Sequence, residues 1–185
     1  MKNSLQNINK LLKSVFLTVL IMVCCANTTK TIAPDPNNES TIKALFVYNF
    51  TKQIEWPAES LNKSQFTICV YGDDEIAEKL IEVVKGRKFL DKNIEVKIIN
   101  KISDINGSQI LFIPRSKAAK TENEMLTIAS NSILIITEEK KMPQNYSCIN
   151  LLEKNEQMRF EINQTSLKKQ NLKVSNTLLK LAINI

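Results

Sequence analysis

Short apolar segments recur along the middle of the chain and predict buried β-strands. Three of them are nearly continuous runs of β-forming residues, and two of these runs stop at Gly72 and Pro114. The fourth alternates apolar and polar residues, which is typical of a half-buried strand. The four segments are 65–71 (QFTICVY), 94–98 (IEVKI), 110–113 (ILFI) and 133–136 (ILII).

Between these segments the apolar residues follow a helical period. One helix is predicted after the first strand, with Asp73 or Asp74 as its N-cap and Gly86 closing it in the left-handed conformation. A second helix is predicted through Met125 and Ile128. The apolar stripe of the first of these helices is Ile76, Leu80, Ile81 and Val84.

The stretch 44–57, ALFVYNFTKQIEWP, belongs to an earlier predicted helix. This helix is expected to begin at Ser40 or Thr41 and to end near Glu55, because Pro57 disfavours helix in the residue before it. The expected buried face combines five apolar and two polar positions on one side of the helix. These positions are Ile42, Leu45, Phe46, Phe50 and Ile54, with Asn49 and Gln53 among them.

Tyr48 and Trp56 are the candidates in this stretch for contact with a partner. Tyr48 falls outside the predicted buried face and is expected to be exposed. Trp56 follows the helix, where its ring either covers the core or projects toward a partner. Phe46 and Phe50 are assigned to the core.

A β-hairpin is predicted near the C-terminus. Residues 147–152 and 157–163 flank the polar tetrapeptide 153–156, in which Asn155 tolerates a positive φ. Side chains alternate across the second strand. The inward set is Met158, Phe160 and Ile162, and the outward set is Arg159, Glu161 and Asn163.

Arg159 and Asn163 are therefore candidates for binding a carboxylate of a partner. The alternative is a solvated face, since Arg159 lies beside Glu161 on the same side of the strand.

Two helices are expected after the hairpin, one near 165–170 and one from Ser175 through Leu178, Leu179 and Ala182. Strands that alternate with helices and then give way to an antiparallel pair define the fold class. We predict a single-domain α/β sandwich with a mixed, mostly parallel sheet, a C-terminal antiparallel hairpin and flanking helices.

The N-terminal residues 1–26 have the basic, apolar and small segments of a secretory signal peptide. Residues 27–38 are polar and contain two prolines, so a flexible segment is predicted before a domain at 39–185. The alternative is a lipoprotein tethered through Cys24 or Cys25. Export to the periplasm is predicted in either case.

Composition excludes several kinds of chemistry. The chain has no histidine, the commonest general base and metal ligand, and its three glycines cannot build a P-loop or a dinucleotide-binding fingerprint. Its lysines are scattered along the sequence, so no basic surface for binding nucleic acid is predicted. We expect no catalytic residues, no metal and no cofactor.

A ligand crevice is one interpretation of the residues that follow the first strand. Gly72, Asp73 and Asp74 lie where a strand meets a helix, and Asn100 and Arg115 follow other strands, so all five are candidates at the carboxyl ends of the sheet. The alternative is a turn with an N-cap.

Cys69 and Cys148 are the cysteines left after the leader. Outside the cytoplasm the environment is oxidising enough for a disulfide to persist. Both cysteines fall in predicted strands, however, and the sequence does not give the distance between those strands. A bridge between them stays open.

Four motifs in fixed order resemble the YfiR family of exported bacterial proteins, over roughly residues 41 to 183. They are ALFVYNFTKQIEWP (44–57), FTICVYGDD (66–74), GSQILFIP (107–114) and MRFEINQTSLKKQNLKVSNTLLKLA (158–182). Where the family often has Cys-His, this chain has Ser108-Gln109. The disulfide which that cysteine could form with the counterpart of Cys69 is therefore absent.

The resemblance implies a non-catalytic periplasmic regulator that holds a membrane-bound diguanylate cyclase inactive. The implied partner is the periplasmic domain of such a cyclase or of another membrane sensor, and a homodimer is a further option. The alternative hypothesis is a periplasmic small-molecule-binding module.

Overall fold

The computed structural model describes residues 39–72, 74–118, 122–125, 128, 132–141 and 145–183. The predicted signal peptide, the predicted flexible segment and the cysteines Cys24 and Cys25 lie outside the described residues, as does Asp73.

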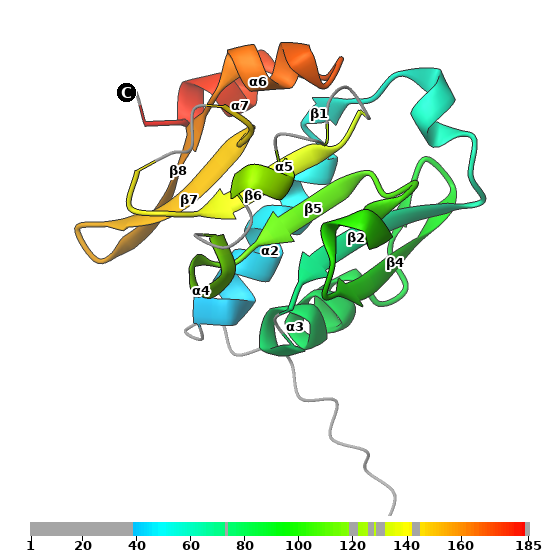
Figure 1. The fold of residues 1–185 in the computed structure, drawn as a ribbon, viewed down its shortest axis with the longest axis horizontal. Coiled ribbons are helices and arrows are strands. Elements are labelled where there is room, and N and C mark those ends of the chain that lie inside the picture. Colours follow the sequence, from blue (N-terminus) through cyan, green and yellow to red (C-terminus); the bar gives the residue numbers. More distant parts are fainter. Residues whose placement is uncertain are drawn as a thin grey trace, which may run out of the picture. The chain divides into compact units, whose positions relative to one another are not determined.

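A seven-stranded sheet in the order β3-β4-β2-β5-β6-β7-β8 forms the centre of the domain (Figure 1). The five strands from β4 to β7 run parallel, and β3 and β8 are antiparallel to their neighbours. This confirms the predicted fold class. The strands are β2 (Gln65–Tyr71), β3 (Lys88–Phe89), β4 (Lys92–Ile99), β5 (Ile110–Ile113), β6 (Leu134–Glu138), β7 (Ile149–Lys154) and β8 (Gln157–Ile162).

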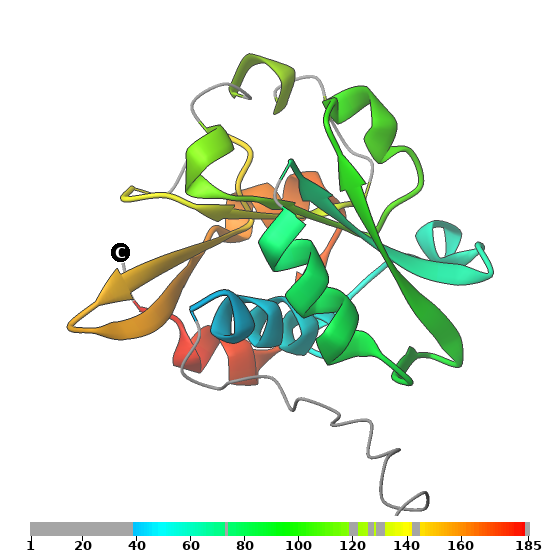
Figure 2. The same ribbon diagram turned by 90° about the horizontal axis from the view of Figure 1, so that it is seen from below.

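Helices cover both faces of the sheet (Figure 2). The strand order steps from β2 to β4 in one direction and then returns past β2 to β5 and β6. Right-handed crossovers therefore put α3 on one face and the later connections on the other. One face carries α2 (Glu39–Thr51), α3 (Asp74–Val84) and α7 (Asn176–Leu181), and the other carries η2 (Ile102–Ile105), α4 (Arg115–Ala118) and α5 (Glu122–Met125). The remaining helices are η1 (Ala58–Leu61) and α6 (Gln164–Lys169).

A second, two-stranded sheet joins β1 (Ile54–Glu55) to β9 (Lys173–Val174). The prediction that the first helix continues to Glu55 is therefore wrong, because α2 ends at Thr51. The Thr51 hydroxyl donates to the carbonyl of Tyr48 at 2.6 Å, and the chain then turns into β1. Pairing with β9 satisfies backbone groups that a longer helix would have used.

The buried face of α2 also differs from the predicted one. Ala44 and Val47 are fully buried, whereas Asn49 is exposed and the predicted core residues Ile42, Leu45 and Phe46 are only half-buried. The helix packs against α3 on one side, while Phe46 and Phe50 contact Phe160 of β8 on another. A helix covered on two sides has no single apolar stripe.

The later helices follow the sequence pattern more closely. In α3 the predicted Ile76, Leu80 and Val84 are buried, but Ile81 is 52% exposed. Gly86 has φ of 72°, as predicted for the residue that closes this helix. The prediction that a helix runs through Met125 and Ile128 is wrong at its second residue, because Ile128 is not helical; the described part of this helix is α5 (Glu122–Met125).

The C-terminal hairpin is confirmed. Lys154 pairs with Gln157 across a two-residue loop in which Asn155 and Glu156 have φ of 53° and 59°. Two consecutive positive φ values are typical of a type I′ turn, which matches the twist of the strands. Phe160 is buried in the core, as predicted.

Candidate functional site

The strand order reverses between β2 and β5, so the loops that leave their carboxyl ends diverge there. Gly72 follows β2 with φ of 54°, and a Cβ atom at this position would lie 3.0 Å from Lys117 Cε and 3.5 Å from Asn100 Oδ1. The structure thus brings Gly72 and Asn100 together and adds the cation Lys117. A ligand crevice at this position stays a prediction. Asp74 is the first residue of α3.

Arg115 takes part in a group of charges at the end of β6. Its Nη2 lies 3.8 Å from Oε1 of Glu138, which is 7% exposed. Lys43 of α2 donates from Nζ to Glu138 Oε1 at 2.9 Å and also contacts Glu39 Oε1 at 2.6 Å. We name these four residues, Glu39, Lys43, Arg115 and Glu138, the carboxyl-end charge cluster.

The charge cluster holds its lysine in the ammonium form. Burial lowers the pKa of Lys43, but hydrogen bonds to Glu39 and Glu138 and the charges of both carboxylates outweigh burial and raise this pKa above its ordinary value. The hydrogen bond from Lys43 lowers the pKa of Glu39. Lys43 is therefore a poor proton acceptor at neutral pH, and the cluster acts as an ion-pair network that ties α2 to β6.

A buried hydrogen-bond network continues from β6 into the hairpin. Thr137 shares a hydrogen bond with Ser147 at 2.8 Å and donates to Asn150 Oδ1 at 2.9 Å. Asn150 in turn donates from Nδ2 to Glu161 Oε2 at 3.1 Å. Glu161, predicted to face outward, is thus anchored across the hairpin. Polar residues inside apolar strands were the only sequence signal for this network.

Tyr48 is 7% exposed, so the expectation that it lies on the surface is wrong. Two cations cover its ring, with Lys52 Nζ at 4.4 Å and Arg87 Cζ at 4.6 Å from the ring centroid. Both distances are typical of cation–π contacts. A partner approaching this position would meet Lys52 and Arg87 before the tyrosine.

Trp56 covers the core. It is 6% exposed, and its ring meets Phe66 and Phe89 edge-on, with centroids 5.2 Å and 5.6 Å away. Its Nε1 donates to the carbonyl of Gln109 at 3.3 Å. The sequence left two placements of this ring open, and the structure has the buried one. Contact between Trp56 and a partner stays a prediction, and the buried ring does not support it.

Arg159 and Asn163 do not share a surface. Arg159 is exposed and donates from Nη2 to Gln157 Oε1 at 2.7 Å. Asn163 is 8% exposed, contrary to prediction, and its Oδ1 accepts from the backbone N–H of Ser166 at 3.0 Å. Asn163 is the N-cap of α6, because an Asn at this position satisfies a helical N–H that would otherwise lack a partner.

Cys69 and Cys148 are both free and buried, and strands β5 and β6 lie between them. The bridge that the sequence left open is therefore not formed. Cys69 Sγ lies 2.9 Å from the hydroxyl of Ser108, the residue that stands where the family often has a cysteine. Burial raises the pKa of both thiols, that of Cys148 to about 12, so neither is a ready thiolate.

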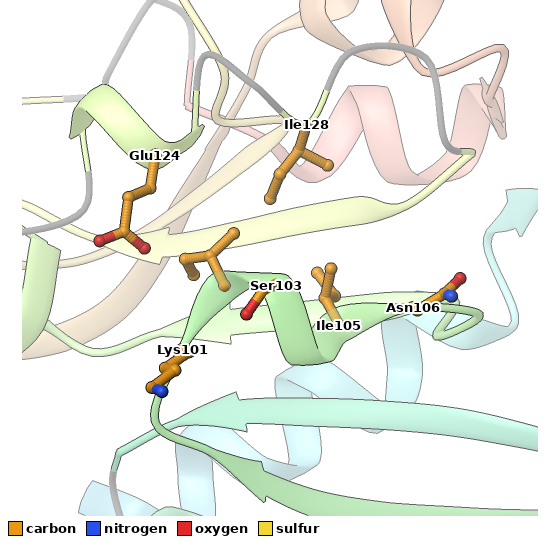
Figure 3. A pocket seen from close by; sticks show the side chains of 7 residues that line it. Lys101, Ser103, Ile105, Asn106, Glu124 and Ile128 are labelled. Carbon is orange, nitrogen blue, oxygen red and sulfur yellow. The ribbon is translucent and has the colours of Figure 1, made fainter.

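A pocket of about 730 Å³ opens on the face of the sheet that carries η2 (Figure 3). Buried Ile102, Ile105 and Ile128 supply its apolar surface. Polar side chains surround them, with Lys101 and Glu124 toward one end of the view and Asn106 at the other. Ser103 completes the lining. Sequence reasoning missed this pocket, because η2 carries no recognisable motif.

The described residues contain no group of three or more His, Cys, Asp or Glu side chains suited to hold a metal ion. Among the described helices, none combines the length and the apolar character needed to cross a membrane.

Comparison with known proteins adds one finding. None of the curated proteins matches this chain. The family model described as YfiR/HmsC-like matches residues 40–183, which include nearly every residue that the structure describes. The chain therefore belongs to the YfiR/HmsC-like family.

Proposed function

We propose that the protein is a periplasmic regulator that binds a membrane-bound signalling protein, such as a diguanylate cyclase, and inhibits it without catalysis. The observation that carries the proposal is the family match over residues 40–183. Membership of this family suggests a periplasmic regulator of cyclic-di-GMP signalling. A regulator of this kind works by binding one state of its partner more tightly than the other.

Several described side chains support a role without chemistry. Lys43 is held as an ammonium between two carboxylates, and both thiols are buried with raised pKa values. These groups are therefore suited to ion pairing and packing and not to proton transfer or nucleophilic attack.

The exposed end of the hairpin is the contact surface that we propose. Arg159 lies on a shallow pocket of about 430 Å³ that it shares with Lys154, Asn155, Gln157 and Ile183. Two exposed cations on a rigid two-residue hairpin suit a carboxylate of the partner. Asn163 supports this surface indirectly by fixing the start of α6. Tyr48 and Trp56 support the domain from inside.

Recovery of the partner from membranes tests the proposal. A tagged full-length chain, expressed in its own host, is expected to co-purify with a membrane protein that carries a periplasmic domain and a cytoplasmic signalling domain. Arg159→Glu is expected to lower this recovery about tenfold, because it repels the same carboxylate. Lys85→Glu, a charge reversal at the exposed residue that follows α3, is the matched control.

The two parts of the proposal fail separately. If no membrane protein is recovered with the wild-type chain, regulation by binding is wrong. If the partner is recovered equally with Arg159→Glu and with Lys85→Glu, the hairpin surface is wrong and the regulator remains. The mass of the exported chain decides between cleavage after Ala26 and a lipid on Cys24 or Cys25.

A small-molecule-binding module is the second candidate, and the pocket beside η2 favours it. Its volume of about 730 Å³ falls within the range of about 300–1,000 Å³ found for ligand sites. A metabolite that raises the melting temperature of the wild-type chain is expected to lose its effect in Ser103→Trp, which fills the pocket. Ser116→Trp, on α4, is the control, and an equal shift in both variants would exclude this pocket.

A further inference from the structure

The tip of the β3–β4 hairpin exposes a leucine in a strained conformation. Leu90 is 67% exposed and forms, with Asp91, the two-residue loop between Phe89 and Lys92. The φ angles of Leu90 and Asp91 are 45° and 64°, as in a type I′ turn. This turn favours Asn and Gly, because a bulky side chain at positive φ is strained. Neither packing nor the turn explains a leucine at this position.

The base of the hairpin is anchored in the core. Phe89 is half-buried, and its ring centroid lies 4.5 Å from that of Phe66 and 5.6 Å from that of Trp56. On the next strand, Lys92 donates from Nζ to the carbonyl of Lys63 at 2.6 Å. The core therefore holds the hairpin in place and presents its tip on a fixed support.

Cations surround the exposed leucine. Arg87, Lys88 and Lys92 carry positive charges in and beside the hairpin, and Arg87 and Lys88 are exposed. Asp91 carries a negative charge at the tip. Lys52 of α2 adds a further exposed cation, because it covers the same aromatic ring as Arg87. The tip thus combines one apolar side chain with a net positive charge.

We propose that this hairpin docks on the surface of an anionic lipid bilayer. Leu90 enters the boundary between head groups and acyl chains, and the cations contact lipid phosphates. A protein partner suits the tip less well, because the core of a protein interface is a contiguous apolar area with few charges. The proposal needs no protein partner and is tested without one.

Docking through this hairpin leaves the other end of the sheet accessible. Strands β3 and β8 are the two outer strands of the seven-stranded sheet. The spacing between neighbouring strands is about 4.8 Å, so the two outer strands lie up to about 29 Å apart. Arg159 of β8 is therefore held away from the bilayer surface, where the periplasmic domain of a membrane protein can reach it.

Vesicle binding tests the proposal. The exported wild-type chain is titrated with vesicles of phosphatidylglycerol and phosphatidylethanolamine, and separately with vesicles of phosphatidylcholine, and its partition coefficients are measured by co-sedimentation. We expect a higher coefficient for the anionic vesicles, and an excess that shrinks as salt screens the charges. The ratio of the two coefficients is the measured quantity, since a lipid on Cys24 or Cys25 favours both vesicles alike. A ratio of one would overturn the proposal.

Replacing the leucine separates docking from folding. Leu90→Asn is expected to raise the melting temperature, because Asn tolerates positive φ, and to lower the partition coefficient for anionic vesicles about tenfold. Leu181→Asn, at the end of α7, is the matched control, because Leu181 is 63% exposed. Its partition coefficient is expected to equal that of wild type. If Leu90→Asn partitions like wild type, the leucine does not enter the bilayer and the proposal is wrong.

Single charge changes test the position of the docking surface. Lys88→Ala is expected to lower partitioning into anionic vesicles about fivefold, and Asp91→Asn to raise it about fivefold. Lys168→Ala removes an exposed cation from α6, far from the hairpin in the sheet order, and is expected to leave partitioning unchanged. Equal losses in Lys88→Ala and Lys168→Ala would show attraction by net charge alone and would overturn the assigned site.

Discussion

The two edges of the main sheet are treated differently by the same chain (Figure 1). At β8 the C-terminal segment returns to the edge, and the backbone N–H of Ile183 donates to the carbonyl of Phe160 at 3.0 Å. At β4 the protecting strand β3 is only two residues long, and residues 94–98 have no described strand beyond them. One edge is covered by the chain itself, whereas no described segment covers residues 94–98 at the other.

The side chains at the two edges also differ in burial, with the β8 side chain buried and the β4 side chain partly exposed. Phe160 of β8 is 6% exposed, and its ring centroid lies 5.3 Å from that of Phe50 and 5.9 Å from that of Phe46. Ile98 of β4 is 44% exposed. The side chain at the covered edge therefore contributes buried apolar surface to the stability of the chain, whereas Ile98 at the open edge contributes less.

The largest effect is expected from truncation at the covered edge. Phe160→Ala removes the ring that joins β8 to α2 and is expected to lower the free energy of unfolding by about 3–5 kcal/mol. Ile98→Ala, at the open edge, is expected to lower it by less than about 1 kcal/mol in the monomer. Urea denaturation at low protein concentration measures both. Similar losses would mean that the two edges do not differ as described.

A smaller effect is expected from the charge cluster at the end of β6. Lys43→Met leaves the more distant Arg115 as the one described cation beside the buried Glu138, and is expected to lower the free energy of unfolding by about 2 kcal/mol. Lys97→Met removes one partner of a pair at the open edge, where the two side chains are 53% and 33% exposed. Its expected cost in the monomer is about 0.5 kcal/mol or less.

The pH dependence of stability separates these two lysines further. Because the pKa of Lys43 is raised in the folded state, folding binds its proton more tightly. The contribution is present below the ordinary pKa of lysine and is lost as the pH rises through the raised value. Wild type and Lys97→Met are therefore expected to lose stability more steeply than Lys43→Met at alkaline pH. Parallel curves for all three proteins would contradict the assigned role of Lys43.

The sequence predicted the centre of this fold better than its margins. Strands β2 and β5 were predicted with their observed bounds, because buried parallel strands are continuous apolar runs and Gly72 and Pro114 end them. The two-residue strands β1 and β9 were missed. Ile54 pairs with Val174, although most of the sequence of the domain lies between them. A strand of two residues is also too short to show an alternation of apolar and polar residues.

The candidate site was harder to predict for a related reason. Lys43 and Glu138 are 95 residues apart in the sequence and form an ion pair only because α2 packs beside the end of β6. In the sequence, a lysine that forms a buried ion pair cannot be distinguished from a solvated lysine on the same predicted helix. Asn163 was placed on the surface by strand alternation, but the strand ends at Ile162, so the alternation no longer applies to it.

The smallest effect concerns this residue, which follows the covered edge directly. Asn163→Ala removes the side-chain oxygen that accepts from Ser166 N–H, and loss of an N-cap of this kind costs about 1 kcal/mol. Asn93→Ala, on the exposed side of β4, is expected to change the free energy of unfolding by less than about 0.5 kcal/mol. If Asn163→Ala instead keeps full stability and loses the membrane partner, Asn163 touches the partner directly. The measured pair of unfolding curves therefore decides whether this asparagine belongs to the scaffold or to the contact surface.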